Sequence, residues 1–356
     1  MHYRSIMKKS ETKPNFIKVI TGIFIAGAAL LLLSACSDSE RKENIESISG
    51  KYSVPVEKQL IVYTSHKEEV YMPIIREFEE RTGIWVDIHE GGTAQMFSEV
   101  RSISESGGCD IMFGGGIESY KAQKDLFMPY ETVEKKYLDG SYLDADNYFT
   151  PFTELPIVFV YNKKLVSYSE IPESWESLFD EKWKGRIAFA DPGRSGTSYT
   201  IISTMEQIFD EEPKSLVTRF YDQIEGKVLS SSGDIIPKVA DGTYLVGITL
   251  EETARKAIEQ GVGIAIIYPL EGTSAVPDGC AIVRNAPHSY NAGKFIDFVV
   301  GYDTQKMAMN NFHRRSVRTD LTDTTYSEFD RIDFDLEKSA SSESEVFAIW
   351  NSLIGN

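Results

Sequence analysis

Cysteine is scarce in this chain of 356 residues, which has only Cys36, Cys109 and Cys280. The sequence contains no Cys/His cluster with zinc-ligand spacing, no Gly-x-Ser-x-Gly hydrolase turn and no phosphate-binding P-loop. Basic residues are also few, because the chain has 37 Lys and Arg but 54 Asp and Glu, which gives a net charge of −17. Such an acidic chain disfavours binding to nucleic acid. We therefore expect no catalytic residues, no cofactor and no nucleic-acid partner.

The N-terminus has the pattern of a secretory signal. Five basic residues precede an uncharged run from Val19 to Leu33, which is short for a membrane-spanning helix. The run ends in Leu33-Ser34-Ala35-Cys36, which resembles the bacterial lipobox. This resemblance implies a signal peptide over residues 1–35, lipidation of Cys36 and an extracytoplasmic chain anchored to the membrane by its lipid. An uncleaved membrane anchor is the alternative.

The mature chain is expected to begin with a tether. Removing the residues before Cys36, which carry five basic groups and one acidic group, takes the net charge from −17 to −21. Residues 36–56 are rich in Ser, Glu and Lys and poor in large apolar side chains, which is typical of a flexible linker. Cys109 and Cys280 could form a disulfide in an oxidising compartment, or remain as two buried thiols.

From residue 59 onward, short apolar runs alternate with helical patterns, which indicates an α/β fold built on parallel sheets. The predicted strands lie at 60–63, 85–88, 111–113, 157–161, 186–190, 245–248, 264–268 and 280–283. The serine-rich stretch Ser339–Ser342 is predicted to be a loop that leads to a closing helix at Val346–Leu353.

Seven segments, taken in order and spacing, resemble the extracytoplasmic solute-binding proteins of ABC importers. The class in question includes ferric-ion, phosphonate and sugar-phosphate binders. The segments are Val62–Glu69, Phe78–Val86, Gly91–Ala94, Asp110–Gly115, Asp191–Ser198, Val239–Tyr244 and Tyr268–Gly279.

This resemblance implies a two-lobed fold of the type 2 periplasmic-binding-protein class, with a ligand cleft between the lobes and two crossing strands near Leu155–Tyr161 and Ile264–Glu271. The first lobe is expected to combine residues 57–155 with 270–320, and the second lobe to cover 156–269. Residues 321–356 are expected to pack back on the body. The implied partners are an ABC permease with its ATPase and one small-molecule ligand, and the protein is expected to be a monomer.

The cleft residues are predicted from the ends of strands and the starts of helices, where ligands of parallel α/β lobes bind. Hydroxyl groups and free backbone N–H groups at such positions suit a phosphate or phosphonate. The alternative for each is a helix cap that satisfies only its own backbone. The candidates of this kind are Thr64, Ser65, His66, Gly92, Thr93, Ser195, Gly196, Thr197 and Ser232.

Glu251 follows a predicted strand of the second lobe and is expected to contact the ligand. The alternative explanation is that its negative charge only stabilises the first turn of the following helix. Asn162 and Thr273, each next to a crossing strand, are weaker candidates. Ferric-ion binders of this class carry adjacent tyrosines where this chain has Glu251 and Glu252, so phenolate ligation of iron is not supported there. Iron is kept as the alternative ligand, with His66, Glu251 and Glu252 as its candidate ligands.

The function expected from the sequence is a lipid-tethered receptor that delivers a small organophosphorus anion to an ABC permease. Phosphoglycerate, sugar phosphate and aminoalkylphosphonate all remain open. An exported hydrolase is a remote alternative, and a ligand-sensing partner of a membrane sensor kinase would have the same fold.

Overall fold

Two β-sheets organise the computed structural model, which describes residues 53–322 and 327–355. The part of the chain from Val56 onward forms a compact unit of its own, and every contact reported below lies within it. In the described ranges, no helix has both the length and the apolarity to cross a membrane. The predicted signal peptide, Cys36 and the tether up to residue 52 lie outside the described residues.

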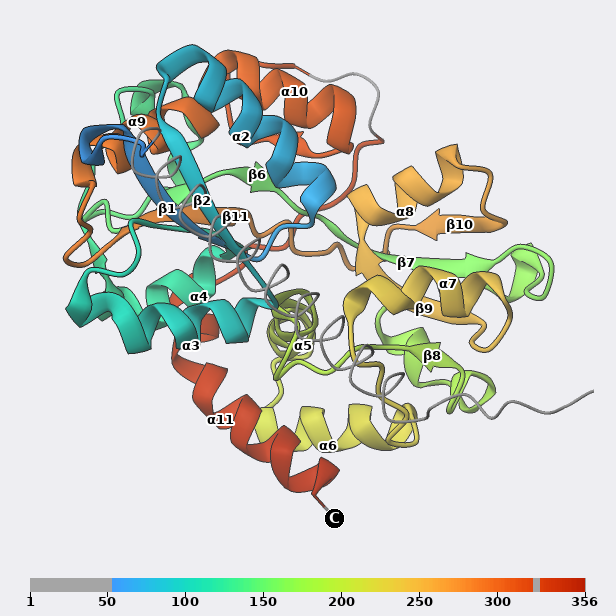
Figure 1. Ribbon diagram of the computed structural model, residues 1–356. Coiled ribbons are helices and arrows are strands. Elements are labelled where there is room, and N and C mark those ends of the chain that lie inside the picture. Colours follow the sequence, from blue (N-terminus) through green and yellow to red (C-terminus); the bar gives the residue numbers. More distant parts are fainter. Residues whose placement is uncertain (1–52, 323–326, 356) are drawn as a thin grey trace, which may run out of the picture. The chain divides into compact units, whose positions relative to one another are not determined.

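The first lobe contains a six-stranded sheet (Figure 1). Its strands run in the order β2 (Trp85–Glu90), β1 (Gln59–Thr64), β3 (Ile111–Gly116), β11 (Asp278–Val283) and β4 (Phe127–Met128), and β5 (Thr150–Pro151) also pairs with β11. β1 is parallel to β2 and β3, as predicted, but β11 is antiparallel to β3. The expectation of purely parallel sheets is therefore wrong. After the second lobe, the chain re-enters the first lobe, and β11 then runs in the direction opposite to β3.

Helices cover both faces of this sheet. One face packs against α2 (Glu68–Thr82), α9 (Ser289–Val299) and α10 (Tyr302–Phe312), and the other against α3 (Thr93–Ile103) and α4 (Ile117–Ala122). α2 follows its apolar periodicity, because Val70, Ile74, Ile75 and Phe78 are all buried on one side.

The second lobe contains a four-stranded sheet in the order β10 (Ile264–Ile267), β7 (Ile157–Asn162), β9 (Val246–Leu250) and β8 (Ile187–Ala188). The β8–β9 pair is parallel and the other two pairs are antiparallel. β7 is buried on both faces. Ile157 and Phe159 pack toward α5 (Gly196–Phe209) and α6 (Pro213–Gln223), whereas Val158 and Val160 pack toward α7 (Ile235–Ala240) and α8 (Glu251–Glu259).

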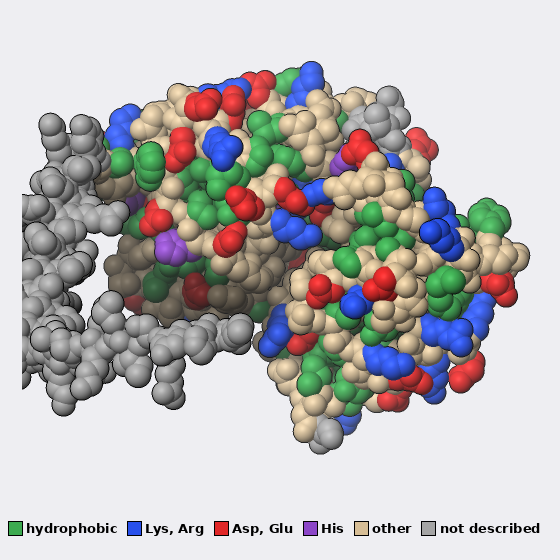
Figure 2. Space-filling view, turned by 45° about the vertical axis from the view of Figure 1, so that its right-hand side comes forward, with side chains coloured by type: hydrophobic (Ala, Val, Ile, Leu, Met, Phe, Trp, Pro, Cys, Tyr) green, Lys and Arg blue, Asp and Glu red, His purple; other side chains and the backbone are tan. Residues whose placement is uncertain are grey.

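The chain enters the second lobe through β7 and leaves it after β10. The short strand β6 (Thr153–Glu154), just before β7, pairs with β12 (Arg315–Ser316). These connections lie near the predicted crossings, and the lobe boundaries at 155/156 and 269/270 remain predictions. Figure 2 shows acidic and basic side chains interspersed over the face that it draws.

The last helix, α11 (Leu336–Ile354), contacts both lobes. It packs against α4 of the first lobe and against α5 and α6 of the second, as Figure 1 shows at the lower edge of the molecule. The prediction of a loop at Ser339–Ser342 is wrong, because these residues form part of the first half of α11. Ser339 and Ser342 are buried there, since small side chains allow the helix to approach its neighbours closely.

Cys109 and Cys280 are free thiols, and both are buried. They belong to different apolar clusters on the two faces of the first sheet. Burial raises the pKa of each thiol, so both remain protonated and act as small apolar side chains. Of the two alternatives for this pair, the structure has the buried thiols.

Candidate functional site

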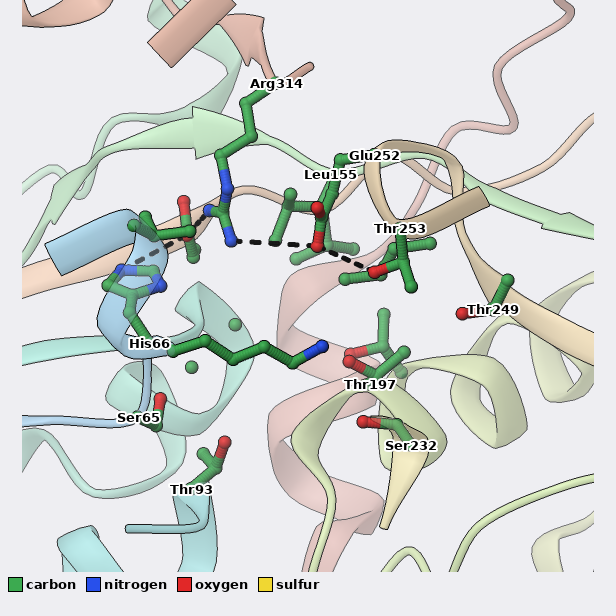
Figure 3. Close-up of a pocket in the computed structure, with 18 of the residues that line it drawn as sticks. Ser65, His66, Thr93, Leu155, Thr197, Ser232, Thr249, Glu252, Thr253 and Arg314 are labelled. Atoms are coloured by element: carbon green, nitrogen blue, oxygen red, sulfur yellow. Dashed lines mark hydrogen bonds and ion pairs between the residues drawn. The ribbon is translucent and has the colours of Figure 1, made fainter. Parts of the chain in front are cut away.

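A cavity of about 130 Å³ lies between the two lobes, and both contribute to its walls. Figure 3 shows side chains of the first lobe on one side and those of the second lobe opposite them. The first lobe supplies Ser65, His66, Lys67, Glu69, Val70, Thr93, Gly115, Gly116, Leu155, Val276, Asp278 and Arg314. The second lobe supplies Thr197, Thr200, Ser232, Thr249, Leu250, Glu252 and Thr253.

Hydroxyl groups at helix starts converge on this cavity from both lobes. Thr93 is the first residue of α3, and Thr197 is the second residue of α5. Ser65 follows β1, and Ser232 opens a short 3-10 helix (Ser232–Asp234). With His66, five of the predicted ligand residues therefore lie in one cavity, and two of them, Thr93 and Thr197, lie at the positive ends of α3 and α5.

Close backbone approach allows the two helix starts to meet. A Cβ atom added to Gly92 would lie 3.1 Å from the backbone oxygen of Arg194, and one added to Gly196 would lie 3.1 Å from Oγ1 of Thr93. Both glycines therefore serve the contact between the lobes. Neither lines the cavity itself, contrary to their prediction as ligand contacts.

Two cationic side chains line the cavity, and neither was among the predicted site residues. The side-chain ammonium of Lys67 makes no hydrogen bond or ion pair with any residue that the structure describes. A Cβ atom added to Gly233 of the second lobe would lie 3.9 Å from its Nζ, so Lys67 reaches across the cleft. Arg314 enters from the segment after α10 and is 5 % exposed. A ligand in the cavity would therefore meet two positive charges.

His66, another predicted ligand residue, also lines the cavity and is buried. Burial lowers the pKa of His66 well below its usual range, and the charge of Arg314 lowers it further. The ring is therefore neutral at pH 7. Its Nε2 atom lies 3.4 Å from Oδ2 of Asp278, which also accepts a hydrogen bond from Nη1 of Arg314.

Glu252, and not Glu251, faces the cavity. Its side chain is 14 % exposed, accepts a hydrogen bond of 2.8 Å from Oγ1 of Thr253 and lies 4.0 Å from Nη2 of Arg314 (Figure 3). The prediction that Glu251 contacts the ligand is corrected by one position. Successive helix residues point about 100° apart, so only one of the two can face the cleft.

Glu251 is instead the centre of a buried ion-pair network. It accepts hydrogen bonds from Nε of Arg255 at 2.8 Å, from Nε of Arg315 at 2.7 Å and from the hydroxyl of Tyr268. Burial alone would raise the pKa of Glu251, but the hydrogen bonds from Arg315, Tyr268 and Arg255 hold it below its usual value. This carboxylate is therefore fully paired within the protein.

Four other predicted residues make local structural contacts away from the cavity. Oγ1 of Thr64 accepts a hydrogen bond from the backbone N–H of His66, and Oγ of Ser195 accepts one from Ser198, as a helix cap. Asn162 donates to the backbone oxygens of Val239 and Ala240. Thr273 is fully buried. None of the four lines the cavity.

The alternative iron ligands His66, Glu251 and Glu252 are not assembled into a metal site. Glu251 points into its own network, and across the described ranges no three His, Cys, Asp or Glu side chains are grouped so that they could hold a metal ion. The candidate set is therefore corrected, although a ferric ion brought with its own oxygen ligands would need fewer protein donors.

Several lining residues with polar side chains escaped the sequence-based reasoning, among them Lys67, Arg314, Thr249 and Thr253. Lys67 is adjacent to His66, and its position after β1 was a usable signal. Thr249 and Thr253 flank the predicted Glu pair. Arg314 had no local signal, because it reaches the cavity only through the long-range pairing of β12 with β6.

The chain matches the family described as "Bacterial extracellular solute-binding protein" over residues 103–332. Among curated proteins, it is 27 % identical over 300 residues to iron uptake protein A1 of Synechocystis sp., covering 79 % of this chain and 80 % of that protein. It is 22 % identical over 255 residues to a candidate 2-aminoethylphosphonate-binding periplasmic protein of Salmonella typhi, covering 69 % and 73 %.

Among solved structures, the chain resembles the periplasmic binding protein AfuA of Actinobacillus pleuropneumoniae with fructose-6-phosphate bound. The TM-score is 0.76 at 22 % identity, and the match covers 83 % of this chain and 98 % of that one. This likeness establishes the two-lobed fold. With a family match over more than half of its length and a cavity between its lobes, the chain belongs to the bacterial extracellular solute-binding proteins and is the substrate-binding protein of an ABC transporter.

Proposed function

We propose that this protein captures a small organophosphorus anion, a phosphate ester or a phosphonate, and delivers it to the permease. The observation that carries the proposal is the set of groups around the cavity. One small cavity is lined by the cationic side chains of Lys67 and Arg314 and by the hydroxyl-bearing residues Ser65, Thr93, Thr197 and Ser232. Hydroxyl donors, cations and helix N-termini together suit a tetrahedral oxyanion.

Lobe closure is the proposed capture mechanism. Ser65, Thr93 and Lys67 come from the first lobe, and Thr197 and Ser232 come from the second, so an open protein would offer only half of the ligand's hydrogen bonds. The closed arrangement satisfies the ligand oxygens together, and the bound solute in turn stabilises that arrangement. Figure 3 shows how the two sets face one another.

A thermal-shift screen of residues 37–356 tests this proposal, since the compact unit begins at Val56. The panel contains phosphoglycerates, sugar phosphates, aminoalkylphosphonates, inorganic phosphate and ferric citrate. A ligand at 100 times its Kd adds about 2.7 kcal/mol to the free energy of unfolding, which raises Tm by several degrees. We expect a shift with at least one organophosphorus compound, and no shift with any of them contradicts the proposal.

Ferric iron is the second candidate, favoured by the match to iron uptake protein A1. His66 and Glu252 are the two predicted iron ligands that line the cavity, and they would have to be joined by oxygen atoms of a carried anion. A shift with ferric citrate alone, abolished by an iron chelator, would support this second function in place of the first.

We further infer that the mature protein is a monomer tethered through a lipid on Cys36. The lipobox-like Leu33-Ser34-Ala35-Cys36 supports the anchor. In cells, the wild-type protein should partition with the membrane fraction, should lack residues 1–35 and should incorporate a labelled fatty acid, whereas Cys36→Ala should incorporate none. A wild-type protein that stays in the membrane fraction at its full mass and without lipid would instead indicate an uncleaved helix.

A further inference from the structure

Three large apolar side chains are exposed at one end of the first lobe. Val56 is 65 % exposed, Trp85 61 % and Tyr290 75 %. Val56 begins the 3-10 helix that leads directly into β1, and Trp85 is the first residue of β2. Tyr290 lies in the first turn of α9. Single exposed apolar residues are common on soluble proteins, so it is the clustering of these three that calls for an explanation.

Backbone pairing and one side-chain contact bring the three segments together. β1 pairs with β2 in a register that places Gln59 opposite Trp85. In the first turn of α9, Nδ2 of Asn291 donates to the backbone oxygen of Gln59 at 2.8 Å. The segment 56–59 therefore lies between the start of β2 and the start of α9. We call the three exposed apolar side chains the basal patch.

The basal patch lies at the opposite end of β1 and β2 from the ligand cavity. Ser65 directly follows β1, Thr93 follows β2 at the start of α3, and both line the cavity. Each of the two strands has six residues, so it is roughly 20 Å long at about 3.3 Å per residue. A partner bound to the basal patch would therefore leave the cavity uncovered.

The N-terminal segment joins the first lobe at this same end. Residues 37–55 connect Cys36, the proposed lipidation site, with Val56. A linker of this length with a flexible composition has an average end-to-end distance of roughly 25 Å. A lipid on Cys36 would therefore hold the basal patch close to the bilayer at a high effective concentration. Under that condition even a weak contact with the lipid becomes populated.

The chemistry of the patch suits lipid headgroups, although its charge does not attract anionic lipid. The whole chain has a net charge of −17, and the segment next to Val56 contains Glu57 as well as Lys58. Tryptophan and tyrosine rings, in contrast, favour the boundary between lipid and water, where the ring is apolar and its polar atom stays hydrated. Nζ of Lys294 lies 4.5 Å from the ring centroid of Tyr290, and such a long side chain can extend to the headgroups.

We propose that the basal patch rests on the surface of the lipid bilayer, with Trp85 and Tyr290 among the headgroups and the ligand cavity directed away from the membrane. The inference rests on the proposed lipid anchor and goes beyond it, because an anchor on a linker sets no orientation of the protein. The contact is apolar, so it should form on zwitterionic lipid and should not weaken in salt.

Tryptophan fluorescence in vesicles tests this inference, because Trp85 is the only exposed tryptophan of the chain. The other three, Trp175, Trp183 and Trp350, are at most 3 % exposed. The lipidated mature protein is reconstituted into phosphatidylcholine vesicles with brominated acyl chains, which quench a tryptophan that reaches the lipid. We expect a loss of about a quarter of the emission, the share of one tryptophan among four. The loss should be the same in ~1 M NaCl.

Substitutions at exposed positions identify the contact. Trp85→Phe should abolish the quenching, because the responding tryptophan is removed. The double variant Val56→Ser with Tyr290→Ser keeps Trp85 but removes the other apolar contacts, so the loss of emission should fall at least threefold. Tyr168→Ser is the matched control, because Tyr168 is 78 % exposed but lies in the second lobe, and it should keep the wild-type quenching.

The outcomes separate this inference from the proposed anchor. If the reconstituted protein carries a lipid but shows no quenching, the membrane contact is overturned and the anchor stands. Equal quenching in the wild type and the double variant overturns the role of the basal patch, because the linker alone would then bring Trp85 to the lipid. If mass spectrometry finds no lipid on Cys36, the anchor and this inference fail together. Self-association of residues 37–356 that the double variant abolishes would assign the patch to a second copy of the chain and overturn the membrane contact.

Discussion

Glu118 is expected to make the stability of this protein fall as pH rises. It lies in the first turn of α4 in the first lobe, is fully buried and accepts a hydrogen bond from Oγ1 of Thr200 on α5 of the second lobe. Its Oε2 has no hydrogen-bond partner. Burial raises the pKa of Glu118 to about 7, with a smaller contribution from the charge of Glu343 on α11.

The direction of this pH dependence follows from proton binding. Between the pKa of an unfolded glutamate, about 4.3, and the folded value of about 7, the folded state binds more protons than the unfolded state. The contribution of Glu118 to the free energy of unfolding is therefore fully present below pH 4 and is lost as the pH rises through 7. The total change is about 3 to 4 kcal/mol, of which about 2 kcal/mol falls between pH 5.5 and pH 8.5.

The assay compares thermal unfolding of the wild type and Glu118→Gln at pH 5.5, 7 and 8.5. Glutamine imitates the protonated acid at every pH, so the decrease in Tm across this range should be about 4 °C smaller in the variant. Absolute stability can change because the new amide lacks an acceptor, so the slope with pH is the readout. Glu80→Gln, an exposed carboxylate on α2, should keep the wild-type slope. Parallel slopes for wild type and Glu118→Gln would refute the reasoning.

Four further substitutions distinguish packing from ligand contact. Trp350→Ala removes a fully buried ring that packs against Phe189 and should cost about 3 to 5 kcal/mol in denaturant unfolding. Thr197→Ala should weaken ligand binding in calorimetry without lowering Tm. Ser195→Ala should instead lower stability by about 1 kcal/mol, because the side-chain cap of α5 is lost, and should leave the Kd nearly unchanged. Glu251→Gln should lower stability by about 3 to 5 kcal/mol, because the buried ion pairs of Glu251 with Arg315 and Arg255 are lost, but should not change which ligands bind. A changed ligand preference in that last variant would contradict our placement of the site.

Local patterns were sufficient for most strands and helices. β1, β7 and β9 are apolar runs of the right length, and α2 shows its buried face as a 3.6-residue repeat. The direction of β11 could not be predicted in this way. It depends on a return across the whole second lobe, and its pairing with β3 is a long-range contact. The serine-rich start of α11 was misjudged because serine is a weak helix former, and tertiary packing against α4 and α5 outweighs that tendency.

Cavity-lining residues could be predicted where they lie at the start of a helix that follows a strand. They could not be predicted where two segments distant in the sequence meet. Thr93 and Thr197 were found because the first turn of a helix after a strand must lie at the ligand edge of the sheet. The choice between Glu251 and Glu252 depends on helix phase, which a two-residue pattern does not determine. Ser195 shows the opposite error, because its hydroxyl is used by the helix that it caps.

Arg314 is the clearest case of a cavity-lining residue that sequence reasoning could not reach. It follows α10 by two positions, in a segment whose only local features are basic residues, and it enters the cavity because β12 pairs with β6 beside the crossing into the second lobe. That pairing places its guanidinium between Asp278 of the first lobe and Glu252 of the second. A charge shared between the two lobes responds both to the ligand and to closure. For this reason we expect the choice of ligand to depend more on Arg314 and Glu252 than on the hydroxyl groups that led to the cavity.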